Sequence, residues 1–303
     1  MTVQHGSMRQ PSRSRKTRWQ ARSRGPYSRH VWLLLRVLDL LPWPWGEEMC
    51  ARLFVAKALV RPSWMRKALT WAEEHPRHGQ SRWRLALSIC AHRGRVAAQH
   101  ALLGIRSPEA LRRHVVLVGE EHLRAASGGI LLGFHLGSPA VAPALCAAGY
   151  RVTWIGGVRA FRSWRSEASR PVREAVDDLS LSGESWASGA ALYRARRVLL
   201  DGGTIYITAD GHGRDAFCVP LPGGSARIKF GWFVLRRECA VPVLPVFAHL
   251  HGHTQVITIY PPIPPPGPDS EHDMVVCRET LTALLEQYLR QFPEQCYGLT
   301  FSV

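Results

Sequence analysis

The chain has 303 residues and carries 39 Lys and Arg against 23 Asp and Glu, which gives a formal net charge of +16. Its apolar content of 46% suits a globular protein with a sizeable core and excludes a disordered or fibrous chain. The seven cysteines include no Cys-x-x-Cys pair. This pattern predicts a reduced, cytosolic chain without a disulfide framework or a zinc site.

Much of the positive charge lies at the start of the chain. Residues 1–29 hold eight Arg and Lys and no Asp or Glu, which predicts a disordered basic tail. The apolar segment 31–41 carries Arg36 and Asp39 and ends before Pro42, so it is too short and too charged to span a membrane. The internal charges also argue against a signal peptide. We expect an uncleaved helix that lies on a membrane.

Residues 30–126 form a region that we predict to be helical and membrane-associating. Apolar residues recur at helical spacing, between Pro and Gly breaks, over 46–60, 62–75, 81–93, 95–104 and 107–123. Seven of the eleven tryptophans fall in the first 83 residues. Tryptophan near arginine suits the boundary of water and lipid, although packing against the rest of the protein explains these rings equally well. Trp43 and Trp45 are the best candidates for the lipid boundary.

Residues 127–303 alternate between strand and helix patterns, which predicts a layered α/β domain. The predicted strands are 129–134, 151–156, 203–208, 217–221, 241–248 and 254–260. The predicted helices are 138–148, 170–179, 187–200, 225–238 and 273–291.

The strongest candidate site lies in the stretch GGILLGFHLGSPA, residues 128–140. A short apolar run is followed at once by His135, and Ser138 then starts a helical pattern as its N-cap. Open α/β sheets bind ligands at this end of their strands. His135 would therefore act as a general base, and backbone N–H groups of Gly137 and Ser138 would hold a developing negative charge. A histidine that only ends a strand is the alternative.

The same stretch resembles the first motif of the lysophospholipid acyltransferase superfamily, in particular its lipid A (lauroyl/myristoyl) acyltransferase branch. That motif reads His-x-Gly, with Glu or Asp five residues after the histidine. His135 and Gly137 match, and Ala140 replaces the acidic residue. Stretches that resemble other parts of the family occur in the family's order, over 116–132, 147–157, 202–247 and 285–298.

The resemblance implies a layered αβα domain with a mixed sheet, preceded by a helical region that docks on a membrane. It also implies transfer of a fatty acyl group from acyl carrier protein or coenzyme A. The acceptor would be a hydroxyl or amine of a lipid A-like or lysophospholipid-like molecule at the cytoplasmic face of a bacterial inner membrane, to which the protein binds as a peripheral or monotopic protein. Neither a metal, a cofactor nor a covalent acyl-enzyme is required.

Asp210 is the best replacement for the missing carboxylate. It follows the predicted strand 203–208, so it should lie at the same edge of the sheet as His135, where the family places an acidic block. A carboxylate there would orient the imidazole and stabilise the imidazolium. A turn residue in Asp-Gly is the alternative. His212 and Asp215 are weaker candidates.

An anionic acceptor needs cations near the site. Arg159, Arg162 and Arg165 follow the second predicted strand of the domain, and the first two would share a helix face. Arg227 and Lys229 lie at a Gly-rich turn before a predicted helix, which is a natural phosphate site. We expect Arg159, Arg162, Arg227 and Lys229 to bind the substrate, with a solvated basic surface as the alternative.

Other readings receive less support. Three imidazoles in HLHGH, residues 249–253, could hold a metal, but Gly252 and the flanking strands favour a hairpin turn. No Gly-x-Ser-x-Gly elbow indicates a serine hydrolase. A pI near 10.3 suggests nucleic-acid binding as a further alternative. However, the charge lies largely in the tail and no motif of a nucleic-acid-binding fold accompanies it, so anionic lipid is the favoured partner. A non-catalytic relative that binds lipid or joins a complex is the remaining alternative.

Overall fold

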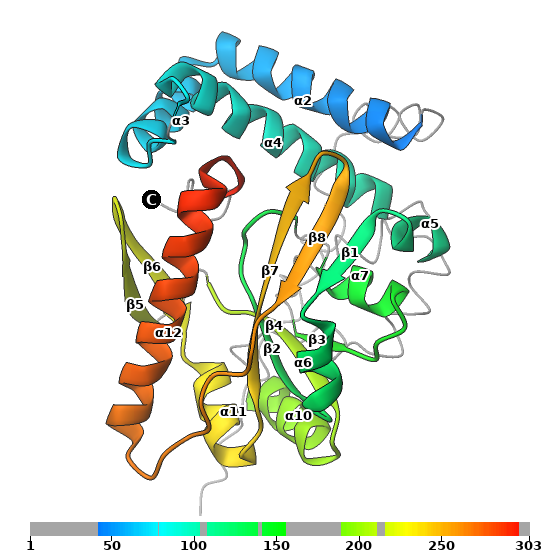
Figure 1. Ribbon diagram of the computed structural model, residues 1–303, viewed down its shortest axis with the longest axis vertical. Coiled ribbons are helices and arrows are strands. Elements are labelled where there is room, and N and C mark those ends of the chain that lie inside the picture. The colour runs from blue at the N-terminus through cyan, green and yellow to red at the C-terminus, as the bar shows by residue number, and fades with distance from the viewer. Residues whose placement is uncertain are drawn as a thin grey trace, which may run out of the picture.

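The computed structural model describes residues 42–77, 79–103, 108–138, 141–155, 189–210 and 216–296. They form a mixed six-stranded sheet with helices on both faces and a group of helices across one end (Figure 1). The predicted α/β fold class is confirmed. The predicted basic tail and the predicted surface helix at 31–41 lie outside the described residues, and none of the described helices is long and apolar enough to cross a membrane.

The sheet has the strand order β1-β8-β7-β2-β4-β3. Its strands are β1 (Val115–Val118), β2 (Gly129–Gly133), β3 (Thr153–Ile155), β4 (Thr204–Thr208), β7 (Val243–His251) and β8 (Thr254–Ile259). Strand β2 lies between β4 and β7, runs parallel to both and is buried along its whole length, as its apolar run predicts. Strands β7 and β8 form an antiparallel hairpin, which makes the sheet mixed and confirms the turn predicted near Gly252.

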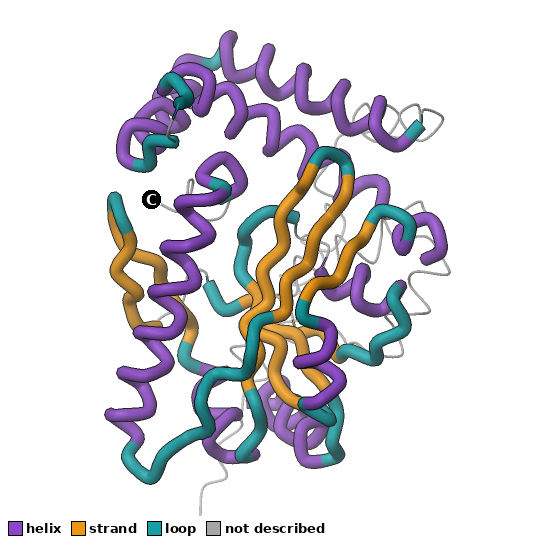
Figure 2. The backbone as a smooth tube through the Cα atoms, viewed as in Figure 1, coloured by secondary structure: helices purple, strands orange, loops and turns teal. Residues whose placement is uncertain are grey.

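Helices lie on either side of the sheet (Figure 2). Alternate side chains of the central strands supply the two apolar layers between them. Ile130 and Leu132 pack on one face with α10 (Gly189–Leu200), α11 (Gly231–Cys239) and α12 (Ser270–Gln291). Leu131 packs on the opposite face with α6 (Glu120–Ala125) and α7 (Val141–Ala147). All three side chains are fully buried, and each such burial contributes about 1.5–3 kcal/mol.

The helices at the N-terminal end are α2 (Trp43–Val60), α3 (Pro62–Glu74), α4 (Arg82–Leu103) and α5 (Pro108–Arg112). Helix α2 ends at Val60, two residues before Pro62, and α3 begins at Pro62, as expected of a residue that cannot continue a helix but can start one. The two helices predicted at 81–93 and 95–104 are instead one helix, α4. Gly94 does not break it but allows α2 to approach, because a Cβ there would lie 2.3 Å from the Cys50 carbonyl oxygen.

These helices are joined to the sheet through a buried carboxylate on α2. Glu47 accepts hydrogen bonds from Gln99 of α4 and from His253 in the β7–β8 turn, both at 2.9 Å. Burial raises the pKa of Glu47, and the bonds with His253 and Gln99 oppose that effect. In Figure 1 the tip of the β7–β8 hairpin reaches toward α4, in agreement with these contacts.

The helix predicted over 107–123 is wrong in its middle. Residues Val115–Val118 form β1, an edge strand parallel to β8, so the sheet begins before residue 127 and the region 30–126 is not entirely helical. Three of its four residues are valine, which favours a strand. Gly119, with φ +76°, ends it.

The helix predicted over 225–238 is wrong in its first part. Residues Gly224–Lys229 form β6, which pairs antiparallel with β5 (Ala216–Leu221) around a turn at Gly223. Gly223 has φ +78°, a conformation that favours glycine. Ala226 and Ile228 are buried on one side of β6, and helix α11 begins only at Gly231.

Candidate active site

His135 and Asp210 occupy equivalent places on two neighbouring strands. Strands β2 and β4 are parallel and end at Gly133 and Thr208, which are partners in register. The Ala209 N–H then donates to the Gly133 carbonyl at 2.8 Å. Because each candidate residue lies two positions beyond its strand, the structure brings them together at the carboxyl edge of the sheet.

The two side chains face each other. His135 Nδ1 lies 3.1 Å from both carboxylate oxygens of Asp210. The Asp210 side chain is 8% exposed, whereas the His135 side chain is 51% exposed. With Nδ1 directed at the carboxylate, Nε2 is the ring nitrogen left to exchange a proton with a substrate.

The charge around the ring sets its protonation. Partial exclusion of water lowers the pKa of His135, but the hydrogen bond from His135 to Asp210 and the charge of that carboxylate together raise it more. Lys229 lowers the pKa through its positive charge. The net result is a pKa above the ordinary histidine value, the direction expected of an imidazole held by a carboxylate.

The β5–β6 hairpin is attached directly to this edge. Asp210 forms a β-bridge with Ile228, and the Lys229 N–H donates to the Ala209 carbonyl at 2.8 Å. Ile228 is buried between exposed Arg227 and half-buried Lys229, so the two cationic side chains share the other side of β6. They therefore lie on a strand rather than at the predicted turn before a helix, and Lys229 is near enough to act on His135.

The other predicted site residues lie outside the described residues: Ala140, Arg159, Arg162, Arg165, His212 and Asp215. The backbone N–H groups of Gly137 and Ser138, which were predicted to hold an oxyanion, are not open to a substrate in this structure. The Gly137 N–H donates to the Gln295 carbonyl at 2.7 Å, and Ser138 is fully buried. An oxyanion role for either residue stays a prediction and would require this loop to move.

Two residues beside the site were not identified from the sequence. His92 of α4 is buried and has a hydrogen bond to the backbone of Gly137. Gln295 lies in the turn η2 (Pro293–Gln295), in the segment whose Pro-Glu-Gln ending resembles the family. That ending was the only sequence signal for either residue.

Two of the three histidines of residues 249–253 have separate partners. His249 stacks on Phe292 with ring centroids 4.2 Å apart, and His253 bonds to Glu47. Within the described ranges, no three His, Cys, Asp or Glu residues are grouped so that they could hold a metal ion.

No protein-family model matches the chain, and no curated protein matches it. Among solved structures, it is similar to the crystal structure of the 1-acyl-sn-glycerophosphate (LPA) acyltransferase PlsC from Thermotoga maritima. The match has 16% sequence identity and a TM-score of 0.42, and it covers 85% of this chain and 98% of that chain. The activity belongs to that protein, and the likeness by itself assigns none to this chain.

Proposed function

We propose that the protein is an acyltransferase that moves a fatty acyl group from an acyl thioester to a hydroxyl, or an amine, of an amphiphilic acceptor at a membrane. The observation that carries this proposal is the approach of His135 Nδ1 to within 3.1 Å of the Asp210 carboxylate. The resemblance of the His135 stretch to the acyltransferase motif supplies the reaction class. Asp210 supplies the carboxylate that Ala140 lacks.

In this mechanism His135 Nε2 takes the proton of the acceptor hydroxyl while the hydroxyl oxygen attacks the carbonyl carbon of the thioester. The C–O bond forms, the tetrahedral intermediate collapses, and the C–S bond breaks. The imidazolium then returns the proton to the departing thiolate. Asp210 orients the ring and stabilises the imidazolium, as in other histidine–carboxylate pairs. The acyl group passes directly between substrates, so no covalent acyl-enzyme forms.

Cations beside the dyad would bind the acceptor. Arg227 and Lys229 lie on the β6 strand that is bridged to Asp210. Arg159 and Arg162 are added to this set from the sequence alone. Guanidinium and ammonium groups favour phosphate, so we assign them an anionic head group of lipid A-like or lysophospholipid-like chemistry. The donor is acyl carrier protein or coenzyme A, both of which are acidic.

The outer side of α2 supports a peripheral place on an anionic membrane. Four large apolar side chains on α2 are 46–81% exposed: Trp45, Leu53, Leu59 and Val60. Exposed cations stand on and directly after the same helix: Arg52, Lys57 and Arg61. Apolar side chains with interspersed cations are the composition of surfaces that bind anionic lipid. We assign this surface to the cytoplasmic face of the inner membrane.

The full chain should consume acyl-coenzyme A or acyl carrier protein in the presence of lysophospholipid or lipid A precursor in vesicles. His135→Ala should lower kcat by at least ~10²–10⁴-fold, the usual contribution of a general base. His251→Ala, at an exposed histidine of β7, should leave turnover unchanged. Wild-type turnover in folded His135→Ala would exclude the mechanism. If no acyl thioester is consumed with any acceptor, a non-catalytic lipid-binding relative becomes the better account.

Ala140→Glu restores the family's acidic position and tests whether Asp210 has replaced it. Asp210→Asn should lower kcat, and adding Ala140→Glu to that variant should recover part of the loss. In the wild-type background Ala140→Glu should preserve or raise activity. A double variant no better than Asp210→Asn alone would show that the two positions are not interchangeable.

A further inference from the structure

Two residues that lie far apart in the sequence contact the loop that carries His135. Both of them contact it at Gly137. The Gly137 N–H donates to the Gln295 carbonyl at 2.7 Å. His92 of α4 lines the same pocket as Gln295, and although burial lowers the pKa of His92, its hydrogen bond with the Gly137 backbone opposes that effect. A bond that opposes the lowering favours the protonated ring, so the imidazole donates and the Gly137 carbonyl accepts.

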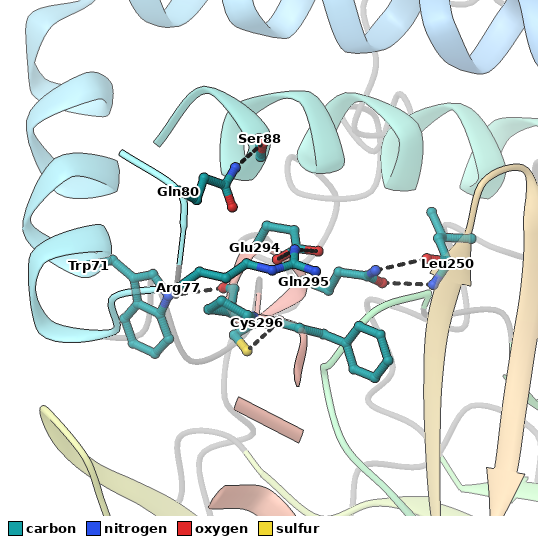
Figure 3. A network of polar contacts seen from close by, with 10 residues as sticks. Trp71, Arg77, Gln80, Ser88, Leu250, Glu294, Gln295 and Cys296 are labelled. Atoms are coloured by element: carbon teal, nitrogen blue, oxygen red, sulfur yellow. Dashed lines mark hydrogen bonds and ion pairs between the residues drawn. The ribbon is translucent and has the colours of Figure 1, made fainter. Parts of the chain in front are cut away.

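Gln295 is itself fixed to the sheet. Its side-chain Oε1 accepts the Leu250 N–H at 2.7 Å, and its Nε2 donates to the Leu250 carbonyl at 2.9 Å, so it pairs with β7 as a strand would (Figure 3). The preceding residues of η2 are held by the N-terminal part of the chain. Trp71 Nε1 donates to the Pro293 carbonyl and Arg77 pairs with Glu294, both at 3.0 Å. The turn therefore cannot shift without breaking contacts on both sides.

The loop backbone at Gly137 has a conformation that favours glycine and no space for a side chain. Gly137 has φ +59°, and a Cβ there would lie 1.8 Å from the Ala248 carbonyl oxygen. Two residues earlier, the His135 N–H is bound by Asp210 at 2.8 Å. Leu136 between them is buried. The imidazole thus extends from a short segment that is anchored at both ends.

His92 is an unusual side chain for a buried position that only packs. It is 3% exposed, and among the described residues its Nε2 has no hydrogen-bond partner. A buried polar atom without a partner destabilises a fold, so an apolar side chain would serve better if only packing mattered. Burial lowers the pKa of His92 to about 4, so at neutral pH it donates to the loop without bringing a second positive charge toward His135.

We propose that His92 and Gln295 are positioning residues that hold Gly137, and through it keep the His135 imidazole against Asp210. The N-terminal helices thereby take part in forming the active site rather than only in docking the protein. The consequence for catalysis rests on the proposed acyltransferase function, whereas the consequence for the geometry of His135 does not.

The test compares three substitutions on α4 in the full chain. His92→Leu removes the donor, His92→Asn keeps an N–H near the position of Nδ1, and Ile89→Val is a control within the buried cluster of the N-terminal helices. Histidine-labelled protein is titrated by NMR to measure the pKa of His135, and kcat and KM are measured with acyl-coenzyme A and a lysophospholipid. His92→Leu should lower the pKa of His135, because the contact with Asp210 is loosened. It should lower kcat about 10- to 100-fold with little change in KM.

His92→Asn should recover much of both effects, and Ile89→Val should match the wild type. If folded His92→Leu keeps the wild-type pKa of His135 and the wild-type kcat, His92 only packs and the proposal is wrong. If His92→Leu does not fold, Gln295→Glu, which loses the donor to Leu250, must lower the pKa of His135 or the proposal fails. If the wild type transfers no acyl group, the proposed function fails. The NMR titration still decides whether the contacts of His92 and Gln295 with Gly137 position His135.

Discussion

Asp210 holds His135 at two points, because Oδ1 accepts its backbone N–H at 2.8 Å while both carboxylate oxygens lie 3.1 Å from ring Nδ1. The same carboxylate therefore fixes both the main chain and the orientation of the imidazole. It lies two residues beyond β4, the parallel strand next to β2. His135 thus has a carboxylate partner even though residue 140 is alanine.

The dependence of turnover on pH should report this pair. A general base must be neutral, so kcat should rise as the pH passes upward through the raised pKa of His135. Asp210→Asn removes the charge that raises this pKa and leaves the surroundings that lower it, so the acidic limb of the profile should move to lower pH while the maximum kcat falls. Asp201→Asn, at an exposed turn, is the control. An unmoved limb in folded Asp210→Asn would refute the pairing in solution.

Lys229 should act on the same limb in the opposite direction. Its charge lowers the pKa of His135, so Lys229→Gln should raise that pKa and move the acidic limb to higher pH. If Lys229 also binds the acceptor head group, KM for the acceptor should rise while KM for the donor stays near the wild-type value. Lys67→Gln, exposed on α3, serves as the control. A shift to lower pH, or equal effects on the two KM values, would contradict this role.

Gly137→Ala should separate backbone strain from steric clash. Gly137 and Gly252 have nearly the same φ, +59° and +60°, but an added Cβ meets the Ala248 carbonyl oxygen at Gly137 and nothing within 4 Å at Gly252. Gly252→Ala should cost about 1–2 kcal/mol of unfolding free energy through strain. Gly137→Ala should cost about 1–3 kcal/mol more through overpacking. Urea unfolding measures both, and equal losses would show that the loop relaxes away from β7.

Membrane binding should depend on the exposed apolar side of α2. Replacing its four exposed side chains by serine, at Trp45, Leu53, Leu59 and Val60, should reduce co-sedimentation with anionic vesicles at least ~10-fold, because each large apolar side chain contributes about 1 kcal/mol or more on leaving water. Serine at Tyr193 and Leu200, exposed on α10, is the matched control. Equal losses in both variants would place the membrane surface elsewhere.

Deletion of residues 1–41 tests the basic tail and the predicted surface helix together. The deletion stops there because Trp43 of α2 stacks on His114 at 4.5 Å, so a longer one would disturb the fold. The shortened protein should move from the membrane pellet toward the supernatant, and the full chain should bind less at high salt. A truncated protein that sediments as before would assign membrane binding to the remaining residues alone.

The site could be predicted from the sequence where local pattern determines position. A glycine-led apolar run ending in His135, and a second run ending before Asp210, indicate buried parallel strands, and such strands carry their functional residues at one edge. Strand β6 could not be predicted in this way. Its alternation is limited to Ala226 and Ile228, and the aromatic residues that follow extend a spacing compatible with a helix.

The positions of His92 and Gln295 depend on tertiary contacts that no local pattern records. A single histidine in an amphipathic helix looks the same whether its ring meets solvent or a loop 45 residues away, as between His92 and Gly137. Gln295 acts through its main-chain carbonyl, which any residue possesses, and its side chain serves only to fix that carbonyl. The sequence could therefore predict that His135 and Asp210 come together but not the residues proposed to hold them.

The contacts of Glu47 and His92 bear on how the protein can be divided. A fragment that began after α4 would leave His253, whose side chain is 38% exposed, without its carboxylate and would leave the buried Gly137 carbonyl without its donor. A buried carbonyl that loses its partner costs about 1–3 kcal/mol. Trimming these helices away would therefore also disturb the loop that carries His135. A variant that tests the proposed lipid binding is better made by changing the outer side of α2 while its inner side stays intact.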